Sequence, residues 1–322
     1  MERDRFVEML NQDLADEHAS ILRYLIHAYQ VGEDTPLGQM LLSTAREEMW
    51  HMNWLGDELG ELGVEPRMDK GYYPFDGTSN ASLLRSYVAW EANLIKLYEE
   101  QADQVESKEL KRILRQLGWE SVTHLRRFEA WLEKLGPEGE EPFEEEAAGF
   151  TPDMLARFQR EMGAQYKLVL QHLRHAFVFE EPHPPVGSEL ELTAMRHMKH
   201  LSHFAEELAE SGEDLPFDFP GVDMSRELEP ALKSDLELTE EARDRFIMFS
   251  QDPELSEHEG LRIELDTMVT RTGLLTTVVG EILEDVEGAG KAEAAPSDCP
   301  CDTSGDALDD APASQLTVGS LK

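Results

Sequence analysis

Apolar residues recur along most of this chain with the 3.6-residue period of an α-helix, and β-strand patterns are weak almost everywhere. The periodicity predicts a long first helix and further helices over about residues 37–62, 81–106 and 109–135. Gly63 and Gly136, each with a proline close behind, are typical helix ends. One long connection follows the second helix, so this part is predicted to be a four-helix bundle with a crossover. The first helix shows the apolar period at Phe6, Met9, Leu10, Leu14, Ile21, Leu22 and Leu25.

The second part of the chain repeats the pattern of the first. Residues 158–177 align with 10–29, and residues 194–212 align with 45–63. Another Pro- and Phe-rich crossover and two more helical stretches follow, so the sequence predicts an all-α fold of two tandem bundles. A tail rich in Ala, Pro, Ser, Gly and Asp has no periodic apolar residues and is expected to be a disordered acidic linker. The predicted units are a first bundle over 1–136, a linker over 137–153, a second bundle over 154–286, a disordered linker over 287–315 and a terminal peptide over 316–322.

The chain is strongly acidic, with 67 Asp and Glu residues against 29 Lys and Arg residues and a formal net charge of −38. This balance argues against nucleic-acid and anionic-membrane partners, which both require basic surfaces. It suits divalent cations, and it also keeps a protein soluble by self-repulsion. With only two cysteines, no signal-peptide pattern and no apolar run of about 20 residues, the sequence predicts a soluble intracellular protein.

Residues that can bind metal occur on every helix of the first unit. The second helix contains an E-x-x-H pattern, whose two side chains share one helix face. Carboxylates are not buried without compensation, and oxygen and nitrogen donors without thiolate suit iron or manganese better than a structural zinc. The candidate metal ligands are Glu17, Glu48, His51, Glu91, Glu120 and His124.

In these residues and their order, positions 5–135 resemble the ferritin-like superfamily and, within it, bacterioferritin. The resemblance implies a di-iron centre, with manganese as the alternative metal, in which Glu17 and Glu91 are terminal ligands. It also implies that Glu48 and Glu120 bridge the metals, that His51 and His124 donate nitrogen, and that Tyr24 and Tyr98 assist beside the ligands. The fourth helix departs from the family's E-x-x-H pattern, because His124 follows Glu120 by four positions instead of three.

The second unit lacks most of these ligands. Gln165 stands in the place of Glu17 and His197 in that of Glu48, so a bacterioferritin-type centre is not expected there. Two roles are left open for the second unit. One is a histidine-rich metal site formed by His172, His197 and His200, with His203 nearby, and the other is a purely structural role.

Met49 follows a ligand glutamate, as the haem-binding methionine of bacterioferritins does, and Met198 is its counterpart in the second unit. The resemblance therefore allows a haem held between the two methionines. Core packing is the alternative role for both side chains.

The chain ends in LTVGSLK, which closely resembles the cargo-loading peptide of encapsulin compartments. Apolar side chains at alternate positions can enter a groove on a partner, and Gly319 allows close backbone approach. The resemblance implies that an encapsulin shell protein is the partner and that the protein resides inside a nanocompartment in the bacterial cytoplasm. Upstream, Cys299-Pro300-Cys301 can bind a soft metal, sense redox state or be inert. The predicted shell-binding residues are Leu316, Thr317, Val318, Gly319, Ser320 and Leu321.

Together these features favour an encapsulin cargo protein with a ferroxidase-type di-iron centre. It would oxidise Fe²⁺ with O₂ or peroxide for iron storage and detoxification. Two alternatives are left open: a di-metal oxidase, peroxidase or oxygenase with another substrate, and a non-catalytic iron-binding cargo. Whether the protein forms a homo-oligomer is also left open.

Overall fold

The computed structural model describes residues 3–143, 149–211, 215 and 217–293, and within these ranges the chain is helical, without a β-strand. The predicted all-α fold class is therefore confirmed for this part of the chain. The predicted shell-binding peptide, both cysteines and most of the predicted 287–315 linker lie outside the described residues.

Side-chain caps hold the N-terminal ends of the second, third and fourth helices. The Thr35 hydroxyl accepts a hydrogen bond from the Gly38 amide at 3.0 Å, and a capping box joins Ser79 and Ser82. Gly63 takes φ +65°, the left-handed conformation that closes many helices. The helices are α1 (Arg3–Gln30), α2 (Pro36–Glu61), α3 (Asn80–Gln104) and α4 (Lys108–Leu135).

Four further helices follow, and the last one is longer than predicted. It continues past the expected end near Val286 to Glu293. Ala, Lys and Glu in this segment favour helix, and the first residue that stops one is Pro296. The elements are the 3₁₀ turn η1 (Gly136–Glu140), α5 (Pro152–Phe179), α6 (Pro184–Glu210), α7 (Leu228–Ser250), the 3₁₀ turn η2 (Pro253–Glu257) and α8 (Glu259–Glu293).

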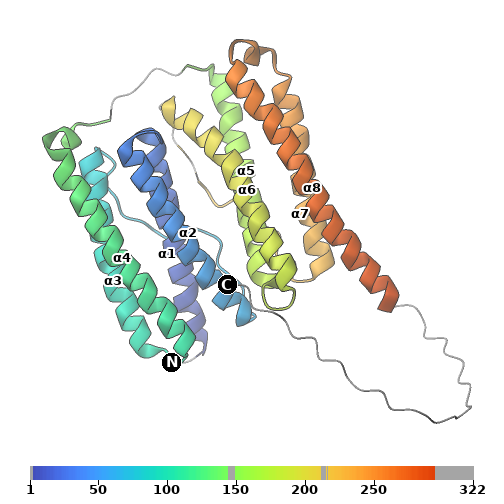
Figure 1. Ribbon diagram of the computed structural model, residues 1–322, viewed down its shortest axis with the longest axis horizontal. Coiled ribbons are helices and arrows are strands. Elements are labelled where there is room, and N and C mark those ends of the chain that lie inside the picture. The colour runs from blue at the N-terminus through green and yellow to red at the C-terminus, as the bar shows by residue number, and fades with distance from the viewer. Residues whose placement is uncertain (1–2, 144–148, 212–214, 216, 294–322) are drawn as a thin grey trace, which may run out of the picture.

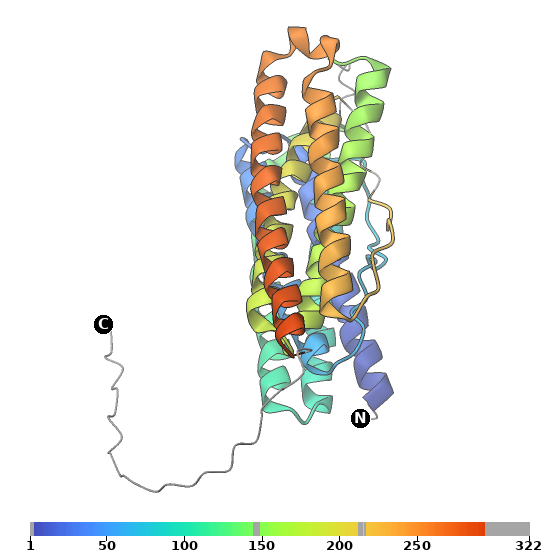
Figure 2. The same cartoon turned by 90° about the vertical axis from the view of Figure 1, so that its right-hand side faces the viewer.

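The helices form two groups of four that lie side by side (Figure 1). Helices α1 and α2 contact α5 and α6 at the centre, while α3 with α4 and α7 with α8 form the two outer layers. Seen from the α7–α8 side, the long helices run roughly along a common direction (Figure 2). We call α1–α4 the first half and α5–α8 the second half. Each half has the same order of helices, with its long crossover between the second and third helix.

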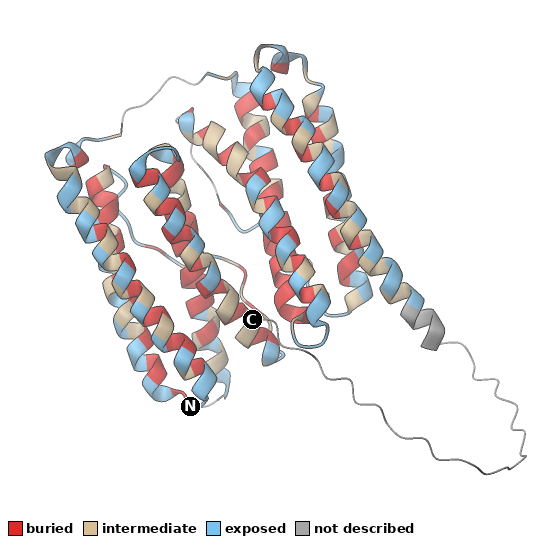
Figure 3. Cartoon of the chain, in the orientation of Figure 1, coloured by how far each residue is buried: buried red, intermediate tan, exposed pale blue. Residues whose placement is uncertain are grey.

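The contact between the halves is reciprocal, with α1 packed on α6 and α2 on α5. The Tyr29 hydroxyl lies 2.8 Å from the Ser202 hydroxyl, and at the opposite contact the Gly56 and Gly60 backbone lies against Phe177. One hydrophobic cluster extends through both halves. Buried residues form stripes along the helices (Figure 3), and this continuous core fixes the position of the helices that bear the candidate site.

Candidate metal centre

Five of the six predicted ligands converge inside the first half. Each comes from a helix whose neighbouring turns are held by the apolar core, so the helix face that bears the ligand points inward. All five ligand residues are only 0 or 1% exposed. These residues are Glu17 on α1, Glu48 and His51 on α2, Glu91 on α3 and His124 on α4.

These five residues form two groups of possible metal ligands that share one member. Glu17, Glu48 and His51 make one group, and the ligand atoms of its members lie within 4.8 Å of one another. Glu48, Glu91 and His124 make the other group by the same measure. Within the described ranges, no further group of this kind is found. The arrangement offers two adjacent ion positions with the Glu48 carboxylate between them.

The two oxygens of Glu48 face different histidines. Oε2 lies 2.7 Å from His51 Nδ1, and Oε1 lies 3.0 Å from His124 Nδ1. Glu17 Oε2 is 3.5 Å from His51 Nδ1, and Glu91 Oε1 is 3.7 Å from His124 Nδ1. The two imidazole rings are stacked with their centroids 5.7 Å apart. The Nδ1 atoms therefore point inward, toward the carboxylates.

Burial and mutual interaction shift the pKa of each group. Burial, reinforced by the charge of Glu48, raises the pKa of Glu17 to about 7. Burial also raises the pKa of Glu91. At Glu48 burial acts in the same direction, but the adjacent His124 and His51 outweigh it and lower the pKa. Burial opposes protonation of the histidines, yet the carboxylates raise the pKa of His124 to about 12 and that of His51 well above its usual value. Positive charge between these carboxylates is thus strongly favoured.

Each histidine is held from outside by a further carboxylate. His51 Nε2 lies 2.7 Å from Glu120 Oε2, and His124 Nε2 lies 2.9 Å from Glu47 Oε2. Carboxylates at the outer nitrogen of a ligating histidine fix its tautomer and orientation. Here they leave both Nδ1 atoms facing the centre.

Glu120 was expected to bridge the metals, and the structure places it outside both groups. The reason is helix geometry: Ser121 occupies the inward position one turn before His124, and Ser121 is buried whereas the Glu120 side chain is 22% exposed. The inner set therefore has three carboxylates and two imidazoles. The contact between Glu47 and His124 was not predicted, because nothing in the sequence shows which acidic residue on α2 reaches a histidine on α4.

Tyr24 and Tyr98 link helices through hydrogen bonds to the candidate ligands. The Tyr24 hydroxyl donates to Glu91 Oε1 at 2.6 Å, and the Tyr98 hydroxyl donates to Glu17 Oε1. Each tyrosine follows one ligand glutamate in its own helix and binds the other one across the bundle. Both hydroxyls therefore restrain the carboxylates that flank the centre.

Comparison with family models, curated proteins and solved structures found no match. What this centre does must therefore be inferred from its own residues.

The histidines predicted for a second site are all buried in the second half. His172 and His197 have ring centroids 5.4 Å apart, and His197 and His200 have centroids 5.7 Å apart. Gln165, which stands in the place of a ligand glutamate, accepts from His197 Nδ1 at 2.9 Å. His203 is partly exposed, and its Nδ1 lies 3.7 Å from Glu264 Oε2. This cluster thus lacks the carboxylates of the first half.

Met49 and Met198 are half-buried and pack against the shared hydrophobic core. Such packing suits the plain structural role of methionine. A haem site at these residues stays a prediction.

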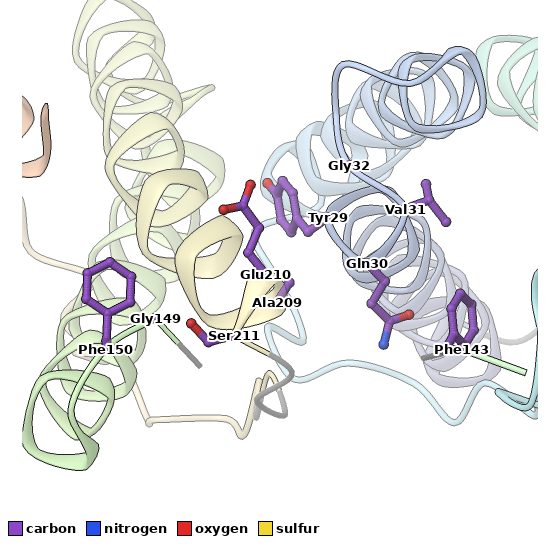
Figure 4. Close-up of a pocket in the computed structure, with 10 residues that line it drawn as sticks. All are labelled: Tyr29, Gln30, Val31, Gly32, Phe143, Gly149, Phe150, Ala209, Glu210 and Ser211. Carbon is purple, nitrogen blue, oxygen red and sulfur yellow. The ribbon is translucent and has the colours of Figure 1, made fainter. Parts of the chain in front are cut away.

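A separate open cavity of about 530 Å³ lies between the halves, at the C-terminal ends of α1 and α6 (Figure 4). The residues that line it include Tyr29, Phe143, Phe150 and Glu210, and none of the predicted metal ligands lines it.

Across the described residues, no helix combines the length and the hydropathy that crossing a membrane requires.

Proposed function

We propose that the first half binds two Fe²⁺ ions and oxidises them with O₂ or peroxide. The observation that carries this proposal is the position of Glu48, whose two oxygens face two histidines and which belongs to both groups of ligands. A shared carboxylate between two nitrogen donors is the arrangement that pairs two ions in helical bundles.

The donor set supports iron or manganese over other metals. Three carboxylates and two imidazoles supply hard and borderline donors, and no described thiolate is near. Two divalent ions would leave a net charge of about +1 on this set, in place of the excess negative charge of three buried carboxylates. A single divalent ion would leave about −1, so charge alone does not choose between one ion and two, and the two groups of ligands that share Glu48 favour the pair.

In this proposal the protein residues position the iron and orient one another around it. Glu48 holds the two ions side by side, while Glu17 and Glu91 complete the two positions. Each Fe²⁺ supplies one electron, so the pair supplies the two electrons that reduce O₂ to peroxide. Glu47 and Glu120 orient the imidazoles, and Tyr24 and Tyr98 orient the outer carboxylates.

We further propose that the chain is a duplicated ferritin-like protein and an encapsulin cargo. The same order of helices and connections in both halves supports duplication. The loss of carboxylates from the second half supports a division of labour, with metal oxidation confined to the first. The LTVGSL sequence near the end of the chain supports loading into a shell, where Fe³⁺ would be stored.

Oxygen uptake on addition of Fe²⁺ to the full-length protein tests the activity. We expect iron-dependent uptake that is lost in a Glu48→Ala, His51→Ala double variant. Glu99→Ala, at an exposed position of α3, is the matched control and should behave as wild type. Equal uptake by the double variant would refute the site. Uptake that requires an added organic substrate would favour an oxygenase instead.

A further inference from the structure

The two groups of ligands in the first half differ in the residues that cover them from outside. They are ion positions only under the proposed function, in which the ions share Glu48. We call the group with Glu17 and His51 the His51 position and the group with Glu91 and His124 the His124 position. All these ligands are buried, so an ion must reach them past residues that are partly exposed.

A partly exposed carboxylate covers each position where α2 and α4 meet. Glu120 Oε2 on α4 lies 2.7 Å from His51 Nε2, and Glu47 Oε2 on α2 lies 2.9 Å from His124 Nε2. The Glu120 side chain is 22% exposed and the Glu47 side chain is 34% exposed, whereas both histidine side chains are buried. Each outer carboxylate therefore lies between the solvent and one ion position.

Among the described residues, only the carboxylate that covers the His124 position is paired with a cation. Arg127 donates hydrogen bonds from Nη1 to Glu47 Oε1 at 3.1 Å and from Nη2 to Glu47 Oε2 at 3.3 Å. Nη1 also donates to the Thr44 hydroxyl at 2.8 Å, which fixes the guanidinium. Glu120 instead accepts from the uncharged amide of Gln116 at 2.8 Å.

This difference in charge makes the two positions unequal for a cation. Three carboxylates surround each position, namely Glu48, one inner glutamate and one outer glutamate. Arg127 cancels the charge of the outer glutamate at the His124 position, and no Lys or Arg within the described ranges does so at the His51 position. By Coulomb's law, one unit charge next to such a site changes the affinity for a divalent ion by about tenfold or more.

We propose that Arg127 sets the order in which the two positions fill. The first divalent ion enters past Glu120 and binds at the His51 position. The second ion binds more weakly at the His124 position, because the Arg127 guanidinium repels it and must release Glu47 as the ion passes. Arg127 acts through Glu47 and is a positioning residue, since none of its described contacts is with an inner ligand.

Calorimetric titration of the full-length protein with Co²⁺ tests the order of filling. Cys299 and Cys301 are potential thiolate ligands, so every protein in the test should contain Cys299→Ser and Cys301→Ser. We expect two binding steps whose affinities differ by about tenfold or more. Arg127→Gln should strengthen the second step by about tenfold and change the first step much less.

Anomalous diffraction locates the first ion and does not depend on any variant of Arg127. Crystals of the background protein with one equivalent of Co²⁺ should show a peak beside Glu17 and His51. The matched control in the titration is Arg126→Gln, which removes the same charge from an exposed position of α4 and should leave both steps unchanged. Thermal unfolding should show that each variant is folded.

The outcomes separate this order of filling from the proposed function. If no Co²⁺ binds at the ligands that share Glu48, both fail. If two ions bind there with equal affinity, or the first peak lies beside Glu91 and His124, the order of filling is wrong and the two-ion centre stands. An unchanged second step in folded Arg127→Gln protein would likewise overturn the role of Arg127 alone.

Discussion

At the residue scale, the geometry of the candidate centre depends on two carboxylates that lie outside it. Glu47 and Glu120 bind the outer nitrogens of His124 and His51, and so hold each Nδ1 toward Glu48. Neither occurs in the two groups of inner ligands, so we infer that they orient the imidazoles.

Neutralising these outer carboxylates should weaken metal binding without removing a site. We expect Glu47→Gln and Glu120→Gln each to lower metal affinity by about 10- to 100-fold while two ions still bind per chain. Competitive metal titration measures this, with Glu99→Gln as the exposed control. Loss of a whole ion in Glu120→Gln would instead show that Glu120 is a direct ligand.

The sequence anticipated the inner residues better than the outer ones. Glu48 and His51 form an E-x-x-H pattern whose residues share a helix face, and the resemblance to bacterioferritin singled this pattern out. The position of Glu120 could not be predicted from the sequence, because a shift of one residue along a helix turns a side chain by about 100° around the helix axis. Which acid reaches the outer nitrogen of His124 depends on how α2 and α4 are rotated against each other.

At the element scale, the contact between α2 and α5 depends on glycine. A Cβ atom at Gly60 on α2 would lie 2.1 Å from the Phe177 carbonyl oxygen on α5, and a Cβ atom at Gly56 would lie 2.5 Å from the Phe177 ring. The helices can lie this close only because these positions have no side chain.

Gly60→Ala should therefore push α2 and α5 apart. We expect a loss of about 1–3 kcal/mol in the free energy of unfolding, as for other overpacked contacts. The matched control is Gly163→Ala on α5, where a Cβ atom meets nothing within 4 Å and should stabilise by about 0.5–1 kcal/mol. Thermal unfolding measures both. A Gly60→Ala protein as stable as wild type would contradict the described packing.

Helix positions were largely predictable, while helix contacts were not. Gly63 marks the end of α2 in the sequence, and it takes the left-handed conformation there. The end of α8 was misplaced because Ala, Lys and Glu permit either a helix or a polar tail. That Gly60 meets Phe177 follows from the folded arrangement of two distant segments, which helical periodicity does not encode.

At the scale of the whole molecule, acidic residues crowd the junction between the halves. Burial, then repulsion from Glu180 and Glu191, raises the pKa of Asp57 to about 7. At the other end of the junction burial, then contact with Glu33, raises the pKa of Glu206 to about 8. Both groups have ordinary values near 4 in an unfolded chain.

This shift predicts how stability depends on pH. Between about pH 4 and pH 8 the folded protein binds more protons at these two carboxyls than the unfolded chain does, so they lower the free energy of unfolding as pH rises. An Asp57→Asn, Glu206→Gln variant should match wild type near pH 4. At pH 9 it should be more stable by about 1 kcal/mol per site, once partial solvent exposure is allowed for. Metal-free thermal unfolding across this range checks the sign, and a variant that loses stability with pH as steeply as wild type would contradict it.

The C-terminal peptide should govern location independently of the folded halves. Deleting residues 316–322 should abolish co-purification with a co-expressed encapsulin shell, because Leu316, Val318 and Leu321 are the proposed apolar anchors. Iron oxidation and thermal unfolding should be unchanged. Fusing the seven residues to an unrelated protein provides the converse test, and the fusion protein should be packaged. Packaging of the truncated chain would show that another part of the protein directs loading into the shell.

The central claim is that Glu48 lies between two metal ions. Anomalous diffraction from crystals soaked anaerobically with Fe²⁺ tests it most directly. We expect two iron peaks about 3.5–4 Å apart, one beside Glu17 and His51 and the other beside Glu91 and His124, with Glu48 contacting both. A single peak, or iron bound away from Glu48, would contradict the account.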